Sequence, residues 1–329
     1  MSTHVPHLLA GLVDDAAVFP PGSAALPDAL AAHRRHRDSW YADLVGPLLV
    51  PASAVVSGEL ARELVDAPGG LADAQVGPAG PAAPAGDSAG NGPGNGPGNG
   101  PGVGSSLVVG LIGDTGIDGL PAALAALPAG VTARQVEVAV AKRGEDPLPG
   151  LTALLGLAGR SGGVDVYAEL PLTFGLMGAL DAVAAARADG VPVAAKFRTG
   201  GLAAELFPTP VELAAVICAC RDRALPFKLT AGLHHAVRHR DPETGFTHHG
   251  FGNVLAATLA AADGAEVDEV AAVLATTDPV PLVERARAAR AADRPLWVGY
   301  GSCSITEPLT DLVRLGLVNA GHDVGGGTT

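Results

Sequence analysis

The chain has 329 residues, of which 48% are apolar and only 4% aromatic, so its core has to be built mainly from Ala, Val and Leu. Acidic residues outnumber basic ones 34 to 21, which gives a formal charge of −13 at pH 7. A field of this sign repels phosphate backbones and anionic lipid, so we expect neither nucleic acid nor a membrane surface as a partner. This net negative charge does not exclude a small phosphorylated ligand held by a local basic cluster.

The cysteine content and the start of the chain indicate where the protein works. Cys218, Cys220 and Cys303 are too few and too badly spaced for a disulfide framework. The opening "MSTHVPHLLAGLVDD" has no basic segment before its short apolar run, and no stretch approaches the roughly 18 apolar residues of a membrane span. We therefore expect a cytoplasmic protein, and the sequence leaves open whether it forms a homo-oligomer.

Apolar runs of strand length alternate with Ala-rich stretches of helix length along the chain. The expected strands are 9–13, 47–51, 107–112, 135–141, 164–169, 192–197, 225–230 and 295–300. The expected helices lie near 26–37, 53–66, 119–127, 149–159, 173–188, 209–222, 252–262 with 279–290, and 307–318. Eight strand–helix units predict a single (βα)8 TIM barrel over 1–329. The main rival is a doubly wound open sheet, but no Gly-rich nucleotide loop follows the first strand.

Three segments stand apart from this alternation. Residues 77–104 repeat "GNGP" without apolar periodicity, which predicts a disordered insertion between the second helix and the third strand. Residues 232–251 follow the seventh strand and hold five of the ten histidines, which predicts a polar, lid-like loop over the catalytic mouth. Residues 323–329 are expected to be a flexible tail.

Two lysines end apolar runs of similar shape, in "VPVAAKFRTGG" (191–201) and "LPFKLTAGLHH" (225–235). Lys196 and Lys228 would lie at the ends of neighbouring strands, about 4.8 Å apart in a sheet. Attack on a carbonyl needs the neutral amine, and burial beside a second cation lowers a lysine pKa. We therefore expect the two lysines to lower each other's pKa. The structural alternative is that they point outward or pair with Glu137 and Glu169.

Five motifs in chain order resemble deoxyribose-phosphate aldolase and its class I, Schiff-base relatives. They are "LVDDAAVFPP", "VYAELPLT", "AKFRTGG", "KLTAGLHH" and "VGYGSCS". The resemblance implies that Lys196 forms a Schiff base, that Lys228 lowers its pKa and that an acid such as Glu137 moves protons through water. Asp14 matches the aspartate of the family's first strand, and Glu169 is a further candidate for proton transfer.

The sequence departs from the family where the substrate would bind. Only Gly232 remains of a glycine pair that holds phosphate in the family, and Arg198 replaces a small hydroxyl residue. A bulkier, more basic mouth suggests an anionic carbonyl substrate, such as a keto acid held by Arg198. The expected substrate-binding residues are Arg198, Gly200, Gly232, His234, His235, Gly301 and Ser302.

Two alternative functions stay open at the level of sequence. The histidine pairs at 234–235 and 248–249 could give a metal-dependent lyase or hydrolase, with His235 and His249 as ligands beside Glu169 or Asp14, although no known metal spacing such as H-E-x-x-H occurs. The aldolase hypothesis itself requires no cofactor. A third hypothesis is a non-catalytic barrel that binds a small ligand.

Overall fold

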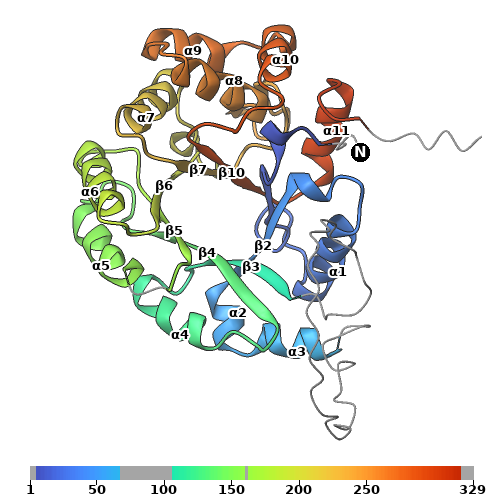
Figure 1. The fold of residues 1–329 in the computed structure, drawn as a ribbon, viewed down its shortest axis with the longest axis vertical. Helices are drawn as coiled ribbons and strands as arrows, with labels where there is room; N and C mark the ends of the chain where they lie inside the picture. The colour runs from blue at the N-terminus through green and yellow to red at the C-terminus, as the bar shows by residue number, and fades with distance from the viewer. Residues whose placement is uncertain (1–4, 67–105, 160–161, 320–329) are drawn as a thin grey trace, which may run out of the picture.

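The computed structural model describes residues 5–66, 106–159 and 162–319. In this part of the chain, eight parallel strands close into a barrel in the order β1-β10-β7-β6-β5-β4-β3-β2, with helices around it (Figure 1). The barrel strands are β1 (Val13–Asp15), β2 (Val45–Pro51), β3 (Leu107–Ile112), β4 (Val131–Ala139), β5 (Asp165–Glu169), β6 (Val193–Arg198), β7 (Phe227–Thr230) and β10 (Trp297–Ser302). The protein is a (βα)8 TIM barrel, as predicted. The predicted insertion at 77–104 and the tail at 323–329 lie outside the described residues.

Eleven α-helices occur in the described residues. They are α1 (Leu26–Arg37), α2 (Ala52–Val56), α3 (Glu59–Asp66), α4 (Leu120–Ala125), α5 (Leu148–Ala158), α6 (Leu176–Ala188), α7 (Pro210–Asp222), α8 (Phe251–Ala262), α9 (Val267–Ala275), α10 (Pro279–Ala288) and α11 (Thr306–Arg314). Short 3-10 turns are η1 (His7–Leu9), η2 (Ala42–Leu44), η4 (Ile117–Gly119) and η5 (Ala204–Leu206). None of these helices is both long and apolar enough to span a membrane.

Local backbone signals explain where the elements differ from the prediction. The first strand was expected at 9–13, but Gly11 has a φ of +58°, which interrupts an extended chain, and β1 begins at Val13. The expected helix at 53–66 is divided at Gly58, whose φ is +74°. The sequence prediction missed α9, although Glu266 and Glu269 form a capping box at its start.

The inside of the barrel is polar, whereas most barrels of this class fill it with branched apolar side chains. Side chains alternate along β6, so Ala195 and Phe197 pack into the apolar core while Lys196 points into the barrel. Gly46 and Gly110 make room on the opposite strands. A Cβ added at Gly46 would lie 1.9 Å from Asp14 Oδ1, and one at Gly110 would lie 2.9 Å from Gln135 Cγ.

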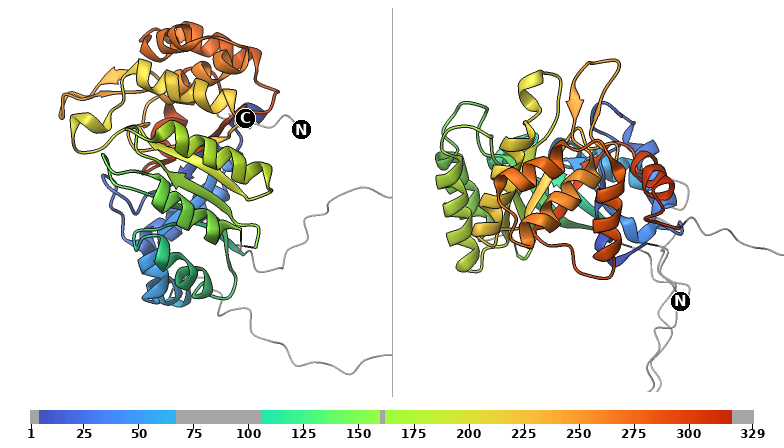
Figure 2. Two further views of the ribbon diagram at one scale, coloured as in Figure 1. Left: turned by 90° about the vertical axis from the view of Figure 1, so that its left-hand side faces the viewer. Right: turned by 90° about the horizontal axis from the view of Figure 1, so that it is seen from above.

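The histidine-rich segment after β7 contains a small antiparallel hairpin of β8 (His239–Arg240) and β9 (Thr247–His248) that stands out from the barrel (Figure 2). Asp241 Oδ1 accepts backbone hydrogen bonds from Glu243 and Thr244, which fixes the turn. The Phe246 ring lies 5.0 Å from the Phe207 ring, so the hairpin packs on the connection between β6 and α7. A lid-like movement of this segment stays a prediction.

Candidate functional site

Six charged side chains from five strands form one continuous row through the barrel, which we call the ion chain. In order they are Asp14, Lys228, Glu137, Lys196, Glu169 and Arg198. Lys228 Nζ contacts Asp14 Oδ2 and lies 2.5 Å from Glu137 Oε1. Lys196 Nζ lies 2.9 Å from Glu137 Oε2 and 2.8 Å from Glu169 Oε2. Signs alternate along the row, so three cations neutralise three carboxylates.

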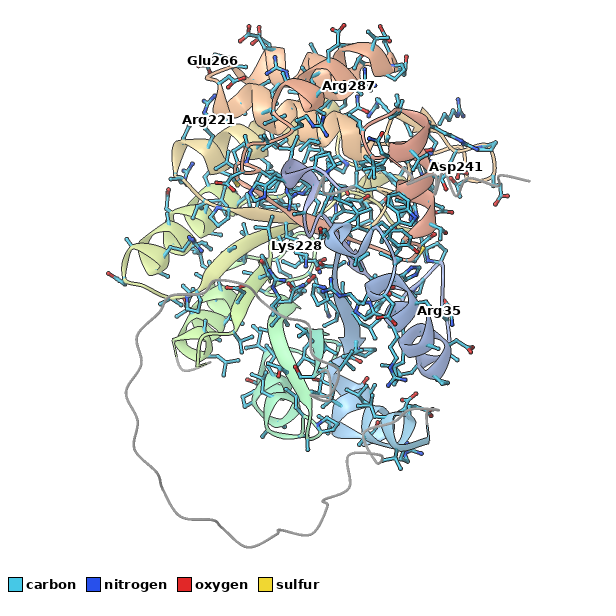
Figure 3. The ribbon with its side chains drawn as sticks, turned by 45° about the vertical axis from the view of Figure 1, so that its right-hand side comes forward. Arg35, Arg221, Lys228, Asp241, Glu266 and Arg287 are labelled. Carbon is cyan, nitrogen blue, oxygen red and sulfur yellow. The ribbon has the colours of Figure 1, made fainter. Side chains whose placement is uncertain are left out.

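Strand register places neighbouring members of the ion chain side by side. Glu169 pairs with Lys196 between β5 and β6, and Lys196 pairs with Lys228 between β6 and β7. Glu137 stands on β4 and reaches across the interior to both lysines. In Figure 3, Lys228 lies in the middle of the barrel, whereas labelled residues such as Asp241 lie on the outside. The closed barrel therefore brings together the five residues expected to be catalytic.

The pKa values of the two lysines are raised, so the prediction that they lower each other's pKa is wrong. Lys196 is only 3% exposed and Lys228 1%. Burial lowers the pKa of Lys228, but Asp14 and Glu137 outweigh it and raise the pKa above 10.5. Burial likewise lowers the pKa of Lys196, and Glu137 and Glu169 outweigh it. Because Glu137 lies between the two ammonium groups, each is paired with carboxylates.

The three carboxylates of the ion chain have different pKa shifts. Burial raises the pKa of Glu137, but Lys228 and Lys196 overcome this effect and lower the pKa to about 2. The pKa of Glu169 is lowered because Lys196 and Arg198 outweigh its burial. The pKa of Asp14 is raised, since its burial, with the nearby Glu137 carboxylate, outweighs the Lys228 cation. Asp14 is therefore the most readily protonated end of this row.

Two interior residues were missed by the sequence reasoning. Gln135 donates hydrogen bonds to Asp14 Oδ2 at 2.7 Å and to Glu137 Oε1 at 2.8 Å. The Tyr167 ring lies beneath Lys228, with Nζ 5.0 Å from the ring centroid. Each stands two residues before a predicted acid on the same strand, so strand alternation was a signal that could have found both.

The predicted substrate-binding residues lie at the carboxyl ends of the strands but not all face one space. Arg198 pairs with Glu169 at 3.0 Å and lines a small cavity of about 140 Å³ at this end of the barrel. Glu169 also lines it, together with Arg143, Glu205, Glu212 and apolar residues of the neighbouring loops. We call this space the upper cavity. It is the point where the ion chain opens toward the carboxyl ends of the strands.

Four other residues expected to bind substrate mainly build the loops around this mouth. Gly200 and Gly232 lie backbone to backbone, since a Cβ at Gly200 would be 2.9 Å from Gly232 Cα. Gly301 is next to the Leu49 side chain inside the barrel. Ser302 is buried, and its hydroxyl donates to the Ser304 carbonyl at 2.7 Å, which fixes the turn after β10.

The histidines of the segment after β7 have separate hydrogen-bond partners and do not converge on one common site. His234 Nδ1 lies 2.9 Å from Glu307, and His235 Nδ1 lies 3.2 Å from Asp311. His249 is buried, its Nε2 lies 2.7 Å from the Pro208 carbonyl, and burial lowers its pKa to about 4. Within the described ranges no three His, Cys, Asp or Glu side chains are grouped to hold a metal ion. The donor set suggested for the metal alternative is therefore not assembled.

Asp15, the acid that follows Asp14 in the sequence, pairs with a residue of the first helix. Asp15 follows Asp14 on β1 and therefore points away from the barrel interior. Its Oδ2 lies 3.0 Å from Nδ1 of His33, a buried residue of α1. This pair joins the first helix to the first strand, and Asp15 takes no part in the ion chain.

No known protein family, curated protein or solved structure matches this chain. The barrel itself defines the class of fold, and the function has to be argued from the ion chain.

Proposed function

We propose that the protein is a lyase of the class I aldolase type, in which Lys196 forms a Schiff base with a small anionic carbonyl compound. The observation that carries the proposal is the position of Lys196, buried between Glu137 and Glu169, with Glu169 at the wall of the upper cavity. Three consecutive members of the ion chain thus have complementary roles. Lys196 is the nucleophile, Glu169 is the proton acceptor and Arg198 is the cation for the substrate.

The raised pKa of Lys196 is compatible with this chemistry because a protonated Schiff base carries the same single positive charge as the ammonium group. Carboxylates that stabilise the ammonium of Lys196 in the empty site also stabilise the iminium formed from it. The neutral amine is needed only for the attack itself. The surrounding charges therefore favour the iminium, which acts as the electron sink for cleaving or forming a C–C bond.

Glu169 is the group that we assign to proton transfer. It accepts a proton from Lys196 Nζ, the free amine attacks the carbonyl carbon, and the carbinolamine hydroxyl leaves as water with the proton returned by Glu169. Glu137, whose pKa is about 2, stays ionised and holds the charge of the iminium. Arg198 would bind the anionic end of the substrate, since its guanidinium lines the same cavity as Glu169.

Borohydride trapping tests the proposal directly, because the chain has only three lysines, Lys142, Lys196 and Lys228. Incubation with pyruvate, 2-oxobutyrate or acetaldehyde and reduction should add the mass of the reduced adduct to the peptide that contains Lys196. Because attack needs the neutral amine and the pKa of Lys196 is raised, the trapping rate should rise about tenfold per pH unit from pH 6 to 9 without a plateau. Lys196→Met should abolish the adduct, while Lys142→Arg should retain it.

Label on Lys142 alone, or on no lysine with any of the three carbonyl probes, would contradict the Schiff base. Such a result would favour the rival function, a barrel that binds a small ligand without covalent chemistry. The neutral, fully paired ion chain is the observation that favours this rival.

A further inference from the structure

A second and larger cavity opens at the other end of the barrel, and we call it the lower cavity. Its volume is about 370 Å³. Gly46 and Arg134, near the starts of β2 and β4, line it together with Pro226, which immediately precedes β7. The upper cavity is lined by residues that end strands, such as Glu169 and Arg198. In parallel strands these two sets lie at opposite ends of the barrel.

The lower cavity reaches the ion chain at the end opposite Arg198. Asp14, Gln135, Tyr167 and Lys228 line it, although each is at least 95% buried. Gly46 keeps this approach open, because a side chain there would collide with Asp14 Oδ1. The row of charges therefore meets one cavity at Asp14 and Lys228 and the other at Glu169 and Arg198.

Two polar atoms at the lower cavity have no hydrogen-bond partner among the described residues. The Tyr167 hydroxyl makes no hydrogen bond to any described residue, and Asp14 uses Oδ2 rather than Oδ1 for its bonds to Lys228 and Gln135. Tyr167 as a whole is only 5% exposed, and the hydroxyl of such a tyrosine normally has a hydrogen-bond partner. A polar cavity of this size has room for several waters, each of which needs two to four polar neighbours.

We propose that the lower cavity is a water-filled entrance through which the ion chain exchanges protons with solvent, with the Tyr167 hydroxyl and Asp14 holding the connecting water. Lys228 passes a proton to Asp14 and Asp14 passes it to this water. Lys228 regains a proton from the same water by the reverse path, so its ammonium group exchanges hydrogen with solvent while Glu137 stays ionised. The use of this route in catalysis rests on the proposed Schiff base, but the entrance itself does not. Carbonyl substrate would thus enter at one end of the barrel, while Lys228 exchanges its protons with water at the other.

Hydrogen exchange of lysine ammonium groups tests the entrance without any substrate. In protein labelled with ¹⁵N-lysine only three ammonium signals can arise, and that of the exposed Lys142 exchanges fast with water. Ala10 is exposed at the rim of the lower cavity, so Ala10→Trp places a large ring over it. We expect the exchange of Lys228 with water to become at least tenfold slower. Ala31→Trp, on the exposed face of α1, should leave it unchanged.

A second, conservative variant tests the proposal even if Ala10→Trp alters the fold. Tyr167→Phe keeps the ring beneath Lys228 and removes only the hydroxyl, and we expect it to slow the exchange of Lys228 at least threefold. Unchanged exchange in Tyr167→Phe and in a folded Ala10→Trp would overturn the proposal, as would slowing by Leu206→Trp at the upper cavity instead. Failure of borohydride trapping together with the predicted slowing would remove the Schiff base and keep the entrance.

Discussion

At the scale of single residues, neighbouring carboxylates serve different purposes according to the direction in which each points. Asp14 faces the barrel interior and contacts Lys228, whereas Asp15 faces outward and pairs with His33. Glu137 is the central member of the ion chain, because its two oxygens are divided between Lys228 and Lys196. A buried carboxylate shared by two ammonium groups is favourable only while both cations stay in place.

Glu137→Gln should destabilise the protein by about 3–5 kcal/mol, because it leaves two buried ammonium groups with less negative charge. Urea denaturation at pH 7 measures this change. Asp293→Asn removes an exposed carboxylate paired with His7 and should cause no measurable change. Equal midpoints for Glu137→Gln and the natural chain would show that the ion chain does not contribute to stability.

The same comparison has a defined dependence on pH. The pKa of Glu137 is about 2 in the folded protein against an ordinary value of 4.5, so its contribution is complete above about pH 4.5 and is lost as the pH falls toward 2. The difference in stability between the natural chain and Glu137→Gln should shrink over this interval.

At the scale of elements, the glycines of β2 and β3 make a charged interior possible. Gly46 stands opposite Asp14, and Gly110 stands opposite Gln135 and Leu49. Any larger residue at either position would occupy space that the polar side chains now fill. The strands β2 and β3, which carry none of the ion chain, therefore determine its position as much as the strands that carry it.

Gly46→Ala should destabilise the protein by about 1–3 kcal/mol, because the added methyl group meets the Asp14 carboxylate and has to displace it from Lys228. Gly156→Ala is the matched control, since it lies within α5 and its methyl group would meet no atom within 4 Å. We expect that control to stabilise the protein by about 0.5–1 kcal/mol through helix propensity. Thermal unfolding of both variants checks the two signs, and a neutral Gly46→Ala would show that Asp14 can move freely.

At the scale of the whole molecule, the closure between β1 and β10 joins the two ends of the chain. Val13 to Asp15 pair in register with Tyr300 to Ser302. Arg294 supports this closure, because its guanidinium donates to the carbonyls of Leu8, Ala10, Trp297 and Val298. Burial lowers its pKa to about 10, so it is still a cation at neutral pH. One side chain thus connects the segment before β1 to the last strand.

Arg294→Met should destabilise the whole barrel by at least about 3 kcal/mol, because four carbonyls lose a charged donor worth roughly 1.5–3 kcal/mol each before compensation by water. Arg290→Met, at an exposed position nearby, should have no measurable effect. Urea denaturation followed by both circular dichroism and tryptophan fluorescence should give one shared transition at lower urea. Separate transitions for the two probes would show that Arg294 holds only the terminal segment.

The sequence was sufficient to predict the fold because the alternation of apolar strands with Ala-rich helices is a local property, repeated eight times. It also predicted correctly that Lys196 and Lys228 lie on neighbouring strands, since strand order in such a barrel follows chain order, but Lys228 is the second residue of β7 and not its end. The observed bounds of helices and strands differ from the predicted ones where a single residue changes the backbone direction, as at Gly11 and Gly58. Interior residues such as Gln135 could in principle have been predicted from the alternation of side chains along a strand.

The electrostatics of the site depended on contacts between residues far apart in the chain. Lys228 meets Asp14 across 214 positions and Glu137 across 91, and only closure of the barrel brings these groups together. Adjacent strands suggested that two cations repel each other, but a carboxylate from β4 lies between them and reverses the sign of the pKa shift. The sequence determined which charged residues line the barrel, and the tertiary structure decided which of them neutralise one another, because Coulomb energy depends on distance in space.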